Sequence, residues 1–317
     1  MVETKHNRLD VHHHILPLDY VKVFGRKTAW SAQQAVEVMD ANGIACALTS
    51  ISTSVEVADD PDATAKLARA CNESAANLSR DYPGRFGMFA ALPMYSMDAA
   101  IQEVDYAFDT LASDGVILMT NYNDKHLGDA SFDPLLAHLN RRKAVVFVHP
   151  TTCSCTPGHP AMPDSMLEFP FDTTRTIISL FFAQAYAKYK DIRFIFCHGG
   201  GTIPFLTYRI DLRMQGNAVI EQNEPLDIRA ALRGLYFELA ISVSPPMVQA
   251  LLDIVPVEKL LLGTDYPFVV PWRVEATMAD YGKLALKDEN LEKIEYRNGC
   301  SLFPRLATLP GFAPGQL

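Results

Sequence analysis

The residues of this chain best suited to chemistry are histidines and one aspartate that close short apolar runs. They are His12, His14, His149, His198 and Asp265. Residues two positions apart in a strand point to the same side, so His12 and His14 can reach one ion while His13 faces away. With His149 and Asp265 they would offer a divalent metal three nitrogens and one oxygen. We expect Zn²⁺, with Mn²⁺ as the alternative, because ligand type alone does not separate the two ions.

Any one of these histidines, taken alone, would be interpreted as an ordinary polar residue near a core. Their shared position favours a metal site, because the active sites of parallel α/β barrels are assembled from residues at the carboxyl ends of the strands. The constellation therefore predicts a metal-binding site rather than a set of isolated buried histidines.

The composition excludes several classes of protein. With 28 Lys plus Arg against 37 Asp plus Glu, the formal charge is −9, which is unsuited to binding nucleic-acid phosphates. No apolar run approaches the length needed to cross a bilayer, and residues 1–8 lack the apolar stretch of a secretory signal. We expect a cytoplasmic protein with neither a membrane nor a nucleic-acid partner. Its six cysteines are expected to be reduced thiols, although Cys153, Cys155 and His159 could also form a metal site.

Short apolar runs alternate with longer segments of helical periodicity along the whole chain. Strands are predicted at Leu9–His13, Ala45–Ile51, Phe86–Leu92, Gly115–Met119, Val145–His149, Arg193–Cys197, Leu235–Leu239 and Leu260–Gly263. Helices are predicted at Ser31–Asn42, Pro61–Tyr82, Met97–Ser113, Asp133–Arg142, Thr173–Tyr189, Pro204–Ile220, Pro245–Val255 and Trp272–Leu286. This alternation predicts one α/β domain, a (β/α)₈ TIM barrel over residues 1–317, rather than an open doubly wound sheet.

Two segments fall outside this alternation. The Pro-rich residues 151–172 are expected to form a long loop that serves as a lid or a wall of the site. Residues 301–317, which include three prolines and two glycines, are expected to pack as a C-terminal tail.

The motifs at the strand ends, in this order, resemble the amidohydrolase superfamily, and more narrowly its aminocarboxymuconate-semialdehyde decarboxylase branch. They are His12-His-His14, His149-Pro150, His198-Gly-Gly-Gly-Thr-Ile-Pro204 and Gly263-Thr-Asp-Tyr-Pro-Phe268. The resemblance extends from Asp10 to about Phe303. It implies a metal-dependent hydrolase type of barrel, with a divalent ion held by His12, His14, His149 and Asp265 and with His198 as a nearby acid/base group.

Two local stretches are most similar to the 6-methylsalicylate decarboxylases of fungal polyketide pathways. They are Leu9-Asp-Val-His-His-His-Ile-Leu-Pro17 and Glu168-Phe-Pro-Phe-Asp-Thr-Thr-Arg175. Other members of the superfamily use two metals bridged by a carboxylated lysine at the end of strand four. The corresponding run, Gly115–Asn121, contains no lysine, which favours a single metal.

Substrate contacts are expected from one arginine and several aromatic residues. Arg209 resembles an arginine that, in the decarboxylase branch, reaches into a neighbouring subunit's site and binds a carboxylate, so a homodimer is implied. A salt bridge to Asp211 or Glu221 is the open alternative for this residue. Phe171 and Phe268 are the expected aromatic contacts, and further candidates for the pocket wall are Phe169, Tyr266, Trp272, Ser52 and Thr53.

We expect a nonoxidative decarboxylase of an ortho-hydroxybenzoic acid, with 6-methylsalicylate converted to 3-methylphenol and CO₂ as the best single example. An aryl carbanion is poorly stabilised, so protonation of the ring carbon should precede loss of CO₂. Asp265 would deliver that proton, and His198 would orient Asp265 or hydrogen-bond the phenol oxygen. Two other classes stay open: a metal-dependent lactonase or amidohydrolase with Asp265 as general base, and a catalytically silent barrel with a structural role.

Overall fold

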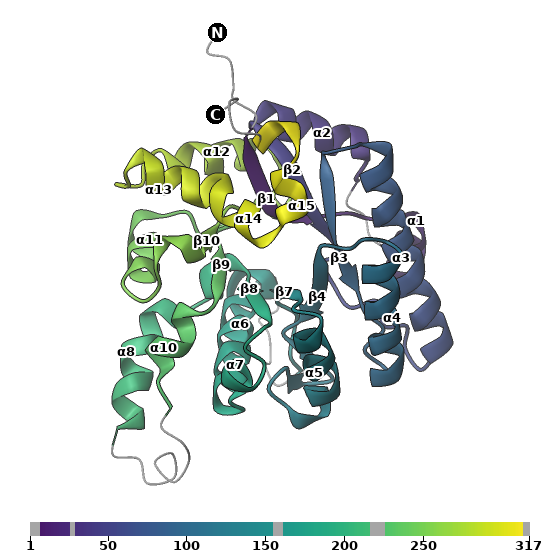
Figure 1. Ribbon diagram of the computed structural model, residues 1–317, viewed down its shortest axis with the longest axis horizontal. Coiled ribbons are helices and arrows are strands. Elements are labelled where there is room, and N and C mark those ends of the chain that lie inside the picture. Colours follow the sequence, from purple (N-terminus) through teal and green to yellow (C-terminus); the bar gives the residue numbers. More distant parts are fainter. Residues whose placement is uncertain (1–6, 26–28, 155–160, 216–225, 313–317) are drawn as a thin grey trace.

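The chain folds into a barrel of eight parallel strands that is surrounded by helices (Figure 1). The computed structural model describes residues 7–25, 29–154, 161–215 and 226–312. In barrel order the strands are β1 (Arg8–His14), β2 (Ile44–Ser50), β3 (Phe86–Ala91), β4 (Gly115–Met119), β7 (Val145–His149), β8 (Arg193–Phe196), β9 (Tyr236–Glu238) and β10 (Leu260–Leu261). A two-stranded hairpin, β5 (Asn121–Tyr122) with β6 (Lys125–His126), follows β4.

The barrel is nearly closed by backbone hydrogen bonds between β1 and the segment after β10. Val11 N–H donates to the Leu262 carbonyl at 3.0 Å, and His14 N–H donates to the Tyr266 carbonyl at 2.7 Å. These contacts place the residues that follow β10 directly beside His12 and His14. Most residues of the strands are apolar and buried, as expected for parallel strands covered by helices.

Helices follow most strands and form the outer layer. The α-helices are α1 (Leu18–Phe24), α2 (Ala32–Ala41), α3 (Pro61–Asp81), α4 (Met97–Asp109), α5 (Asp133–Arg141), α6 (Asp164–Phe182), α7 (Ala185–Lys188), α8 (Ile203–Met214), α10 (Ile228–Arg233), α11 (Pro245–Leu252), α12 (Pro271–Tyr281), α13 (Asp288–Glu292), α14 (Asn298–Leu302) and α15 (Pro304–Ala307). Side chains that accept a backbone N–H of the first turn begin several of them: Ser31 for α2, Asp60 for α3 and Ser96 for α4.

The eight predicted strands are confirmed to within two residues at either end. The expected loop over residues 151–172 is wrong in its second half, because α6 begins at Asp164. Pro170 suggested a loop, yet it lies inside this helix, where the Thr174 hydroxyl donates to its carbonyl at 2.8 Å. The expected tail is likewise helical over α14 and α15, and Phe312 stacks on Tyr296.

The cysteine prediction needs one correction. Cys46, Cys71, Cys197 and Cys300 are free thiols as expected, but Cys153 is disulfide-bonded. Cys155 and His159, the other members of the possible metal site, lie outside the described residues.

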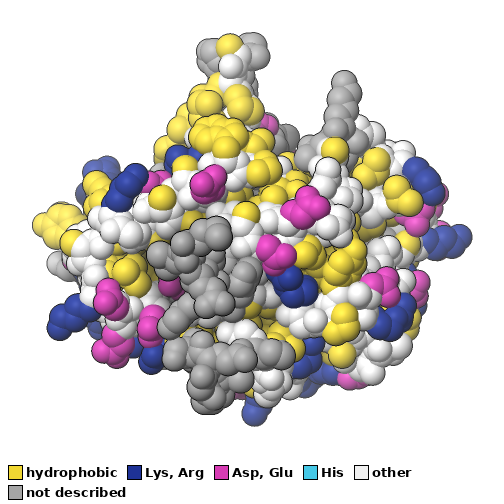
Figure 2. Space-filling view, turned by 90° about the horizontal axis from the view of Figure 1, so that it is seen from above, with side chains coloured by type: hydrophobic (Ala, Val, Ile, Leu, Met, Phe, Trp, Pro, Cys, Tyr) yellow, Lys and Arg dark blue, Asp and Glu magenta, His cyan; other side chains and the backbone are white. Residues whose placement is uncertain are grey.

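The surface agrees with the charge balance of the sequence. On the face shown in Figure 2, Lys and Arg side chains are scattered among Asp and Glu rather than gathered into one basic patch. Among the described residues, none of the helices combines the length and the apolar character needed to span a membrane.

A buried carboxylate ties α6 to the small hairpin. Asp172 accepts hydrogen bonds from Asn121 Nδ2 at 2.9 Å and from His126 Nε2 at 2.8 Å. Burial would raise the pKa of Asp172, but these donors more than offset it and hold the pKa below its usual value. The ionised Asp172 carboxylate therefore stabilises the fold at pH values above the pKa of an unfolded aspartate, about 3.9. This stabilisation is lost as the pH falls through the lower pKa of Asp172 in the folded protein.

We expect Asp172→Asn to lower the free energy of unfolding at pH 7 by about 1–3 kcal/mol, because it removes a buried charged acceptor. Urea unfolding at pH 7 and near pH 2, below the folded-state pKa, measures this effect. The difference between wild type and variant should shrink in acid, and an equal difference at both pH values would contradict the assignment.

Candidate metal centre

A cavity of about 420 Å³ opens at the carboxyl ends of the strands. Its wall is built from residues that follow β2, β7, β8, β9 and β10 and from the first half of α6. They include Ser52, Thr53, His149, Thr152, Asp164, Phe169, His198, Ile241, Asp265 and Phe268. The cavity thus contains three of the five residues singled out by the sequence, and the remaining two, His12 and His14, lie beneath it.

His12, His14, His149 and Asp265 converge at the base of this cavity. One ligand atom from each lies within 4.8 Å of all the others, and all four residues are buried. Nε2 of His12 is 2.9 Å from Nε2 of His14, and Oδ1 of Asp265 lies 3.3 Å and 3.1 Å from these two nitrogens. The predicted set is therefore brought together in space by β1, β7 and the segment after β10, which lie far apart in the sequence.

Each of the three rings is oriented by a partner on its other nitrogen. His12 Nδ1 lies 2.8 Å from Glu238 Oε1, and His14 Nδ1 lies 3.0 Å from Ser50 Oγ. His149 Nδ1 donates to the Pro150 carbonyl at 2.9 Å. All three Nε2 atoms are left to point at the shared centre, which is the arrangement expected of histidines that bind a metal. The donor set of three imidazoles and one carboxylate thus fits a first-row divalent ion.

The charges in this cluster are strongly coupled. Burial would lower the pKa of His12, but the carboxylates of Glu238 and Asp265 on either side raise it to about 10. Burial would raise the pKa of Asp265, yet His12 and His14 hold it well below its usual range. Without a metal, a proton on His12 supplies the positive charge between two carboxylates. A bound cation would take that place and would release the proton.

His13 faces the opposite side of β1, as the alternation of the strand predicted. Its Nδ1 lies 3.1 Å from Asp10 Oδ2, and its ring packs against Tyr266 at 5.1 Å between centroids. Asp10 also accepts the Thr264 N–H at 3.0 Å and the Thr264 hydroxyl at 2.6 Å. His13 and Asp10 therefore fasten β1 to the segment that carries Asp265.

Asp265 divides its two oxygens between different neighbours. Oδ1 faces His12 and His14, whereas Oδ2 lies 3.6 Å from His198 Nε2. That distance exceeds a hydrogen bond, and His198 Nε2 has no hydrogen-bond partner among the described residues. A buried, unpaired ring nitrogen beside a carboxylate oxygen on a cavity wall is placed to exchange a proton with a bound molecule.

The backbone at both residues is held in the left-handed region. Asp265 has φ +59°, and His198 has φ +53° and is followed by three glycines that also have positive φ. A side chain at Gly201 would lie 2.0 Å from the Pro170 carbonyl, so this turn packs directly against α6. Left-handed non-glycine residues are costly and cluster at functional sites, which agrees with the placement of both side chains in the cavity.

The predicted substrate contacts are placed differently from one another. Phe268 lines the cavity, with its ring 5.4 Å from that of His14. Phe171 is not among the lining residues and is 37% exposed, whereas Phe169 lines the cavity. The two residues are two positions apart in α6, about 200° around the helix axis, and cannot face the same cavity.

Arg209 is exposed on α8 and does not line the cavity of its own chain. The alternative salt bridge to Asp211 is not formed, because Asp211 pairs with Arg229 at 3.3 Å. Glu221, the other partner considered, lies outside the described residues. Arg209 makes no ion pair within the described part of the chain.

Sequence reasoning missed Glu238, the buried carboxylate that contacts His12. Its signal was a lone charged residue inside the apolar run Leu235–Leu239.

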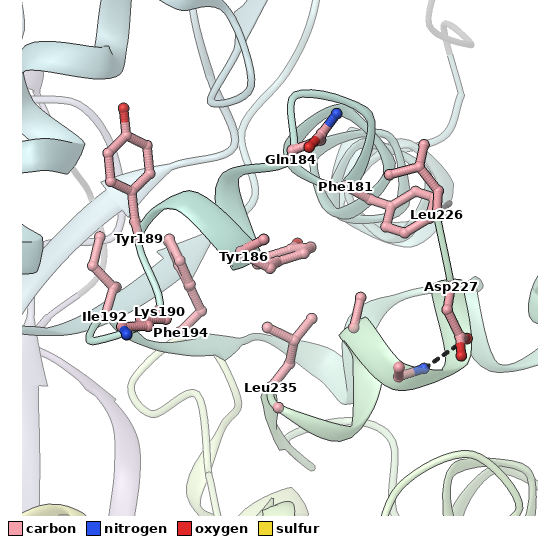
Figure 3. Close-up of a pocket in the computed structure, with 14 residues that line it drawn as sticks. Phe181, Gln184, Tyr186, Tyr189, Lys190, Ile192, Phe194, Leu226, Asp227 and Leu235 are labelled. Atoms are coloured by element: carbon pink, nitrogen blue, oxygen red, sulfur yellow. Dashed lines mark hydrogen bonds between the residues drawn. The ribbon is translucent and has the colours of Figure 1, made fainter. Parts of the chain in front are cut away.

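A larger cavity of about 540 Å³ lies between α7 and α10 (Figure 3). It is lined by Tyr186, Phe194 and Leu235 among others and contains none of the predicted site residues.

Comparison with known proteins agrees with the fold and with the site. Residues 9–305 match the amidohydrolase family. This chain belongs to the amidohydrolase family. A decarboxylase of Aspergillus niger is 34% identical over 94% of this amidohydrolase and 88% of its own length. A 6-methylsalicylic acid decarboxylase of Aspergillus aculeatus is 31% identical over 94% of this chain and 96% of its own.

Among solved structures, 5-carboxyvanillate decarboxylase of Novosphingobium aromaticivorans, complexed with manganese, superimposes with a TM-score of 0.84. It is 17% identical, and the match covers 96% of this amidohydrolase and 97% of that chain. At this identity the likeness concerns the barrel fold.

We expect the purified protein to retain close to one equivalent of divalent metal, and His14→Ala to retain less than about a tenth of that after dialysis, because it removes a ligand. His138→Gln is the matched control, because this ring pairs with Asp105 at 2.8 Å between two outer helices, and its metal content should equal that of wild type. Elemental analysis gives both values. Close to two equivalents in the wild type, or equal loss in both variants, would contradict this site.

Proposed function

We propose that this amidohydrolase is a metal-dependent, nonoxidative decarboxylase of an ortho-hydroxybenzoic acid, with 6-methylsalicylate converted to 3-methylphenol and CO₂ as its reaction. The observation that carries the proposal is the convergence of His12, His14, His149 and Asp265 beneath a cavity walled by aromatic residues. The identity to two named decarboxylases over nearly the whole chain supports the choice of reaction.

His12, His14, His149 and Asp265 would hold the ion, which supplies an electrophilic centre for the substrate carboxylate and the adjacent phenol oxygen. We propose Zn²⁺, because imidazole-rich sets of four ligands suit it, and Mn²⁺ is the competitor that elemental analysis would reveal. Elemental analysis is needed to choose between the two ions, because the similar structure of 5-carboxyvanillate decarboxylase is complexed with manganese.

The proton of the reaction is assigned to the pair formed by Asp265 Oδ2 and His198 Nε2, which lie 3.6 Å apart on the cavity wall. The pair gives a proton to the ring carbon that bears the carboxylate. The carbon–carbon bond then breaks, its electron pair returns to the ring, and CO₂ leaves. A proton from solvent restores the pair, so one substrate anion and one proton yield one phenol and one CO₂.

The remaining wall fits an aromatic acid. Phe169, Ile241 and Phe268 give the cavity apolar surface that can pack on the ring and its methyl group. Ser52 is 6% exposed and its Oγ has no hydrogen-bond partner among the described residues. An unpaired hydroxyl on this wall is available to a substrate oxygen.

We propose a homodimer in which Arg209 serves the partner's site. Phe205, Tyr208 and Leu212, at positions one turn apart on α8, are 61%, 68% and 52% exposed. An apolar stripe of this kind is suited to burial against a second copy, and Arg209 lies between two of its members. A guanidinium there can donate two hydrogen bonds to a carboxylate.

The function is tested by incubating metal-loaded protein with 6-methylsalicylate, other salicylates and a panel of lactones, followed by mass spectrometry. We expect CO₂ and the matching phenol, and loss of at least about 10²-fold in kcat for Asp265→Asn. Ring-opened acids from the lactones without CO₂ would indicate the hydrolase instead, and no product from any compound would favour a silent barrel.

We expect Arg209→Ala to raise KM for the acid about 10–100-fold, the equivalent of one charge-assisted hydrogen bond of about 1.5–3 kcal/mol. Arg80→Ala, a surface arginine on α3, is the control and should leave KM unchanged. Initial rates give KM, and light scattering shows whether the variant is still a dimer. Together they separate substrate binding by Arg209 from dimer formation by α8. Unchanged KM in a dimeric Arg209→Ala protein would remove this residue from the site.

A further inference from the structure

We propose that Glu238 is a positioning residue that fixes His12 and His198 relative to each other, and thereby sets both the metal affinity and the placement of the acid/base group. This inference rests on the proposed metal-dependent function and adds a residue from β9 to its site. Glu238 does not line the cavity, so it acts through its neighbours rather than on the substrate.

Both oxygens of Glu238 accept hydrogen bonds, and Oε1 contacts two residues of the site. Oε1 lies 2.8 Å from His12 Nδ1 and accepts the backbone N–H of His198 at 2.6 Å. Oε2 accepts the backbone N–H of Ala240 at 2.7 Å. One carboxylate therefore joins the ring of a ligand on β1 to the left-handed turn after β8. A shift of this carboxylate would move both.

The burial of Glu238 also indicates that its carboxylate has a positioning role. Glu238 is 0% exposed, and among the described residues its only ion-pair partner is His12. Burying a charge without a partner is costly, so a carboxylate kept inside an apolar strand is stabilised mainly by the histidine that it orients. A hydrogen bond from the far nitrogen to a carboxylate also fixes which ring nitrogen faces the metal.

The glycine at position 263 supplies independent support. A Cβ at Gly263 would lie 2.0 Å from Glu238 Oε2 and 2.8 Å from His12 Cβ. Gly263 does not have a positive φ, so space rather than backbone conformation excludes a side chain there. The motif Gly263-Thr264-Asp265 thus provides a ligand and also the room for the carboxylate that orients another ligand.

A second metal site is the competing explanation, because His12, Cys197 and Glu238 also lie within ligand distance of one another. The three N–H contacts leave Glu238 serving as a hydrogen-bond acceptor. The geometry therefore favours orientation of His12 over coordination of a second ion.

Glu238→Gln tests the assignment, because an amide has one acceptor oxygen and its nitrogen would face a backbone N–H. We expect the dissociation constant for Zn²⁺, measured by competition with a chromophoric chelator, to rise about 10–100-fold. The visible absorption of the Co²⁺-loaded protein should also change, because it reports the geometry of the ligands. Gly263→Ala should produce the same two changes by displacing the carboxylate.

Glu103→Gln is the matched control. Glu103 is also buried, at 4% exposed, but it binds Arg69 and Asn72 on the outer layer. This variant should lose stability and keep the wild-type metal affinity and Co²⁺ spectrum. If Glu238→Gln fails to fold, Gly263→Ala carries the test. Wild-type affinity and spectrum in a folded variant of either position would overturn the proposal.

The wild-type protein separates this outcome from failure of the proposed function. If wild type binds no metal or forms no phenol, the decarboxylase is wrong whatever the variants do. If wild type binds Zn²⁺ and releases CO₂ while folded Glu238→Gln binds Zn²⁺ equally well, only the role of Glu238 is wrong.

Discussion

Balance of buried charge is the constraint on which the site depends. Asp265 and Glu238 are both buried, and the imidazole of His12 lies between them. Two carboxylates in a space of low dielectric need positive charge close by, and only a protonated imidazole or a bound cation can supply it there. The arrangement that is stabilised by a proton on His12 would therefore also attract a divalent ion, which would replace that proton.

The barrel allows this balance because its strands are rigid and its carboxyl ends meet. His12 and His14 come from β1, His149 from β7, and Asp265 from the turn after β10, which hydrogen bonds hold against β1. Asp10 and His13 reinforce that contact from the far side of the strand. A ligand set drawn from several strands keeps its geometry because no single loop can move it.

The strands and the ligand set could be predicted because both follow from local patterns: apolar runs, and polar residues that close them. Other features depend on contacts distant in sequence. Glu238 is a single acid in an apolar run, and only the position of His12 across the barrel gives it a role. Phe169 and Phe171 could be distinguished only once α6 was known to begin at Asp164, since the helix decides which ring faces the cavity. Pro170 favoured a loop in the sequence because proline disfavours the interior of a helix. The packing of α6 against the turn at Gly201 is a contact between distant parts of the sequence, which local patterns do not reveal.

The proposed metal ligands and the proposed substrate contacts belong to different parts of the chain. The proposed ligands lie on strands or directly beside them, whereas Ser52, Phe169, Ile241 and Phe268 belong to connections and to the first half of α6. Changes in these connections cost little core packing, because they alter the cavity wall without moving the strands. Glu238 and Gly263 belong to the first group, since their contacts are with His12 and with backbone. Substitutions of Glu238 or Gly263 should lower activity equally for every substrate. Substitutions in the connections should change the preference for one aromatic acid over another.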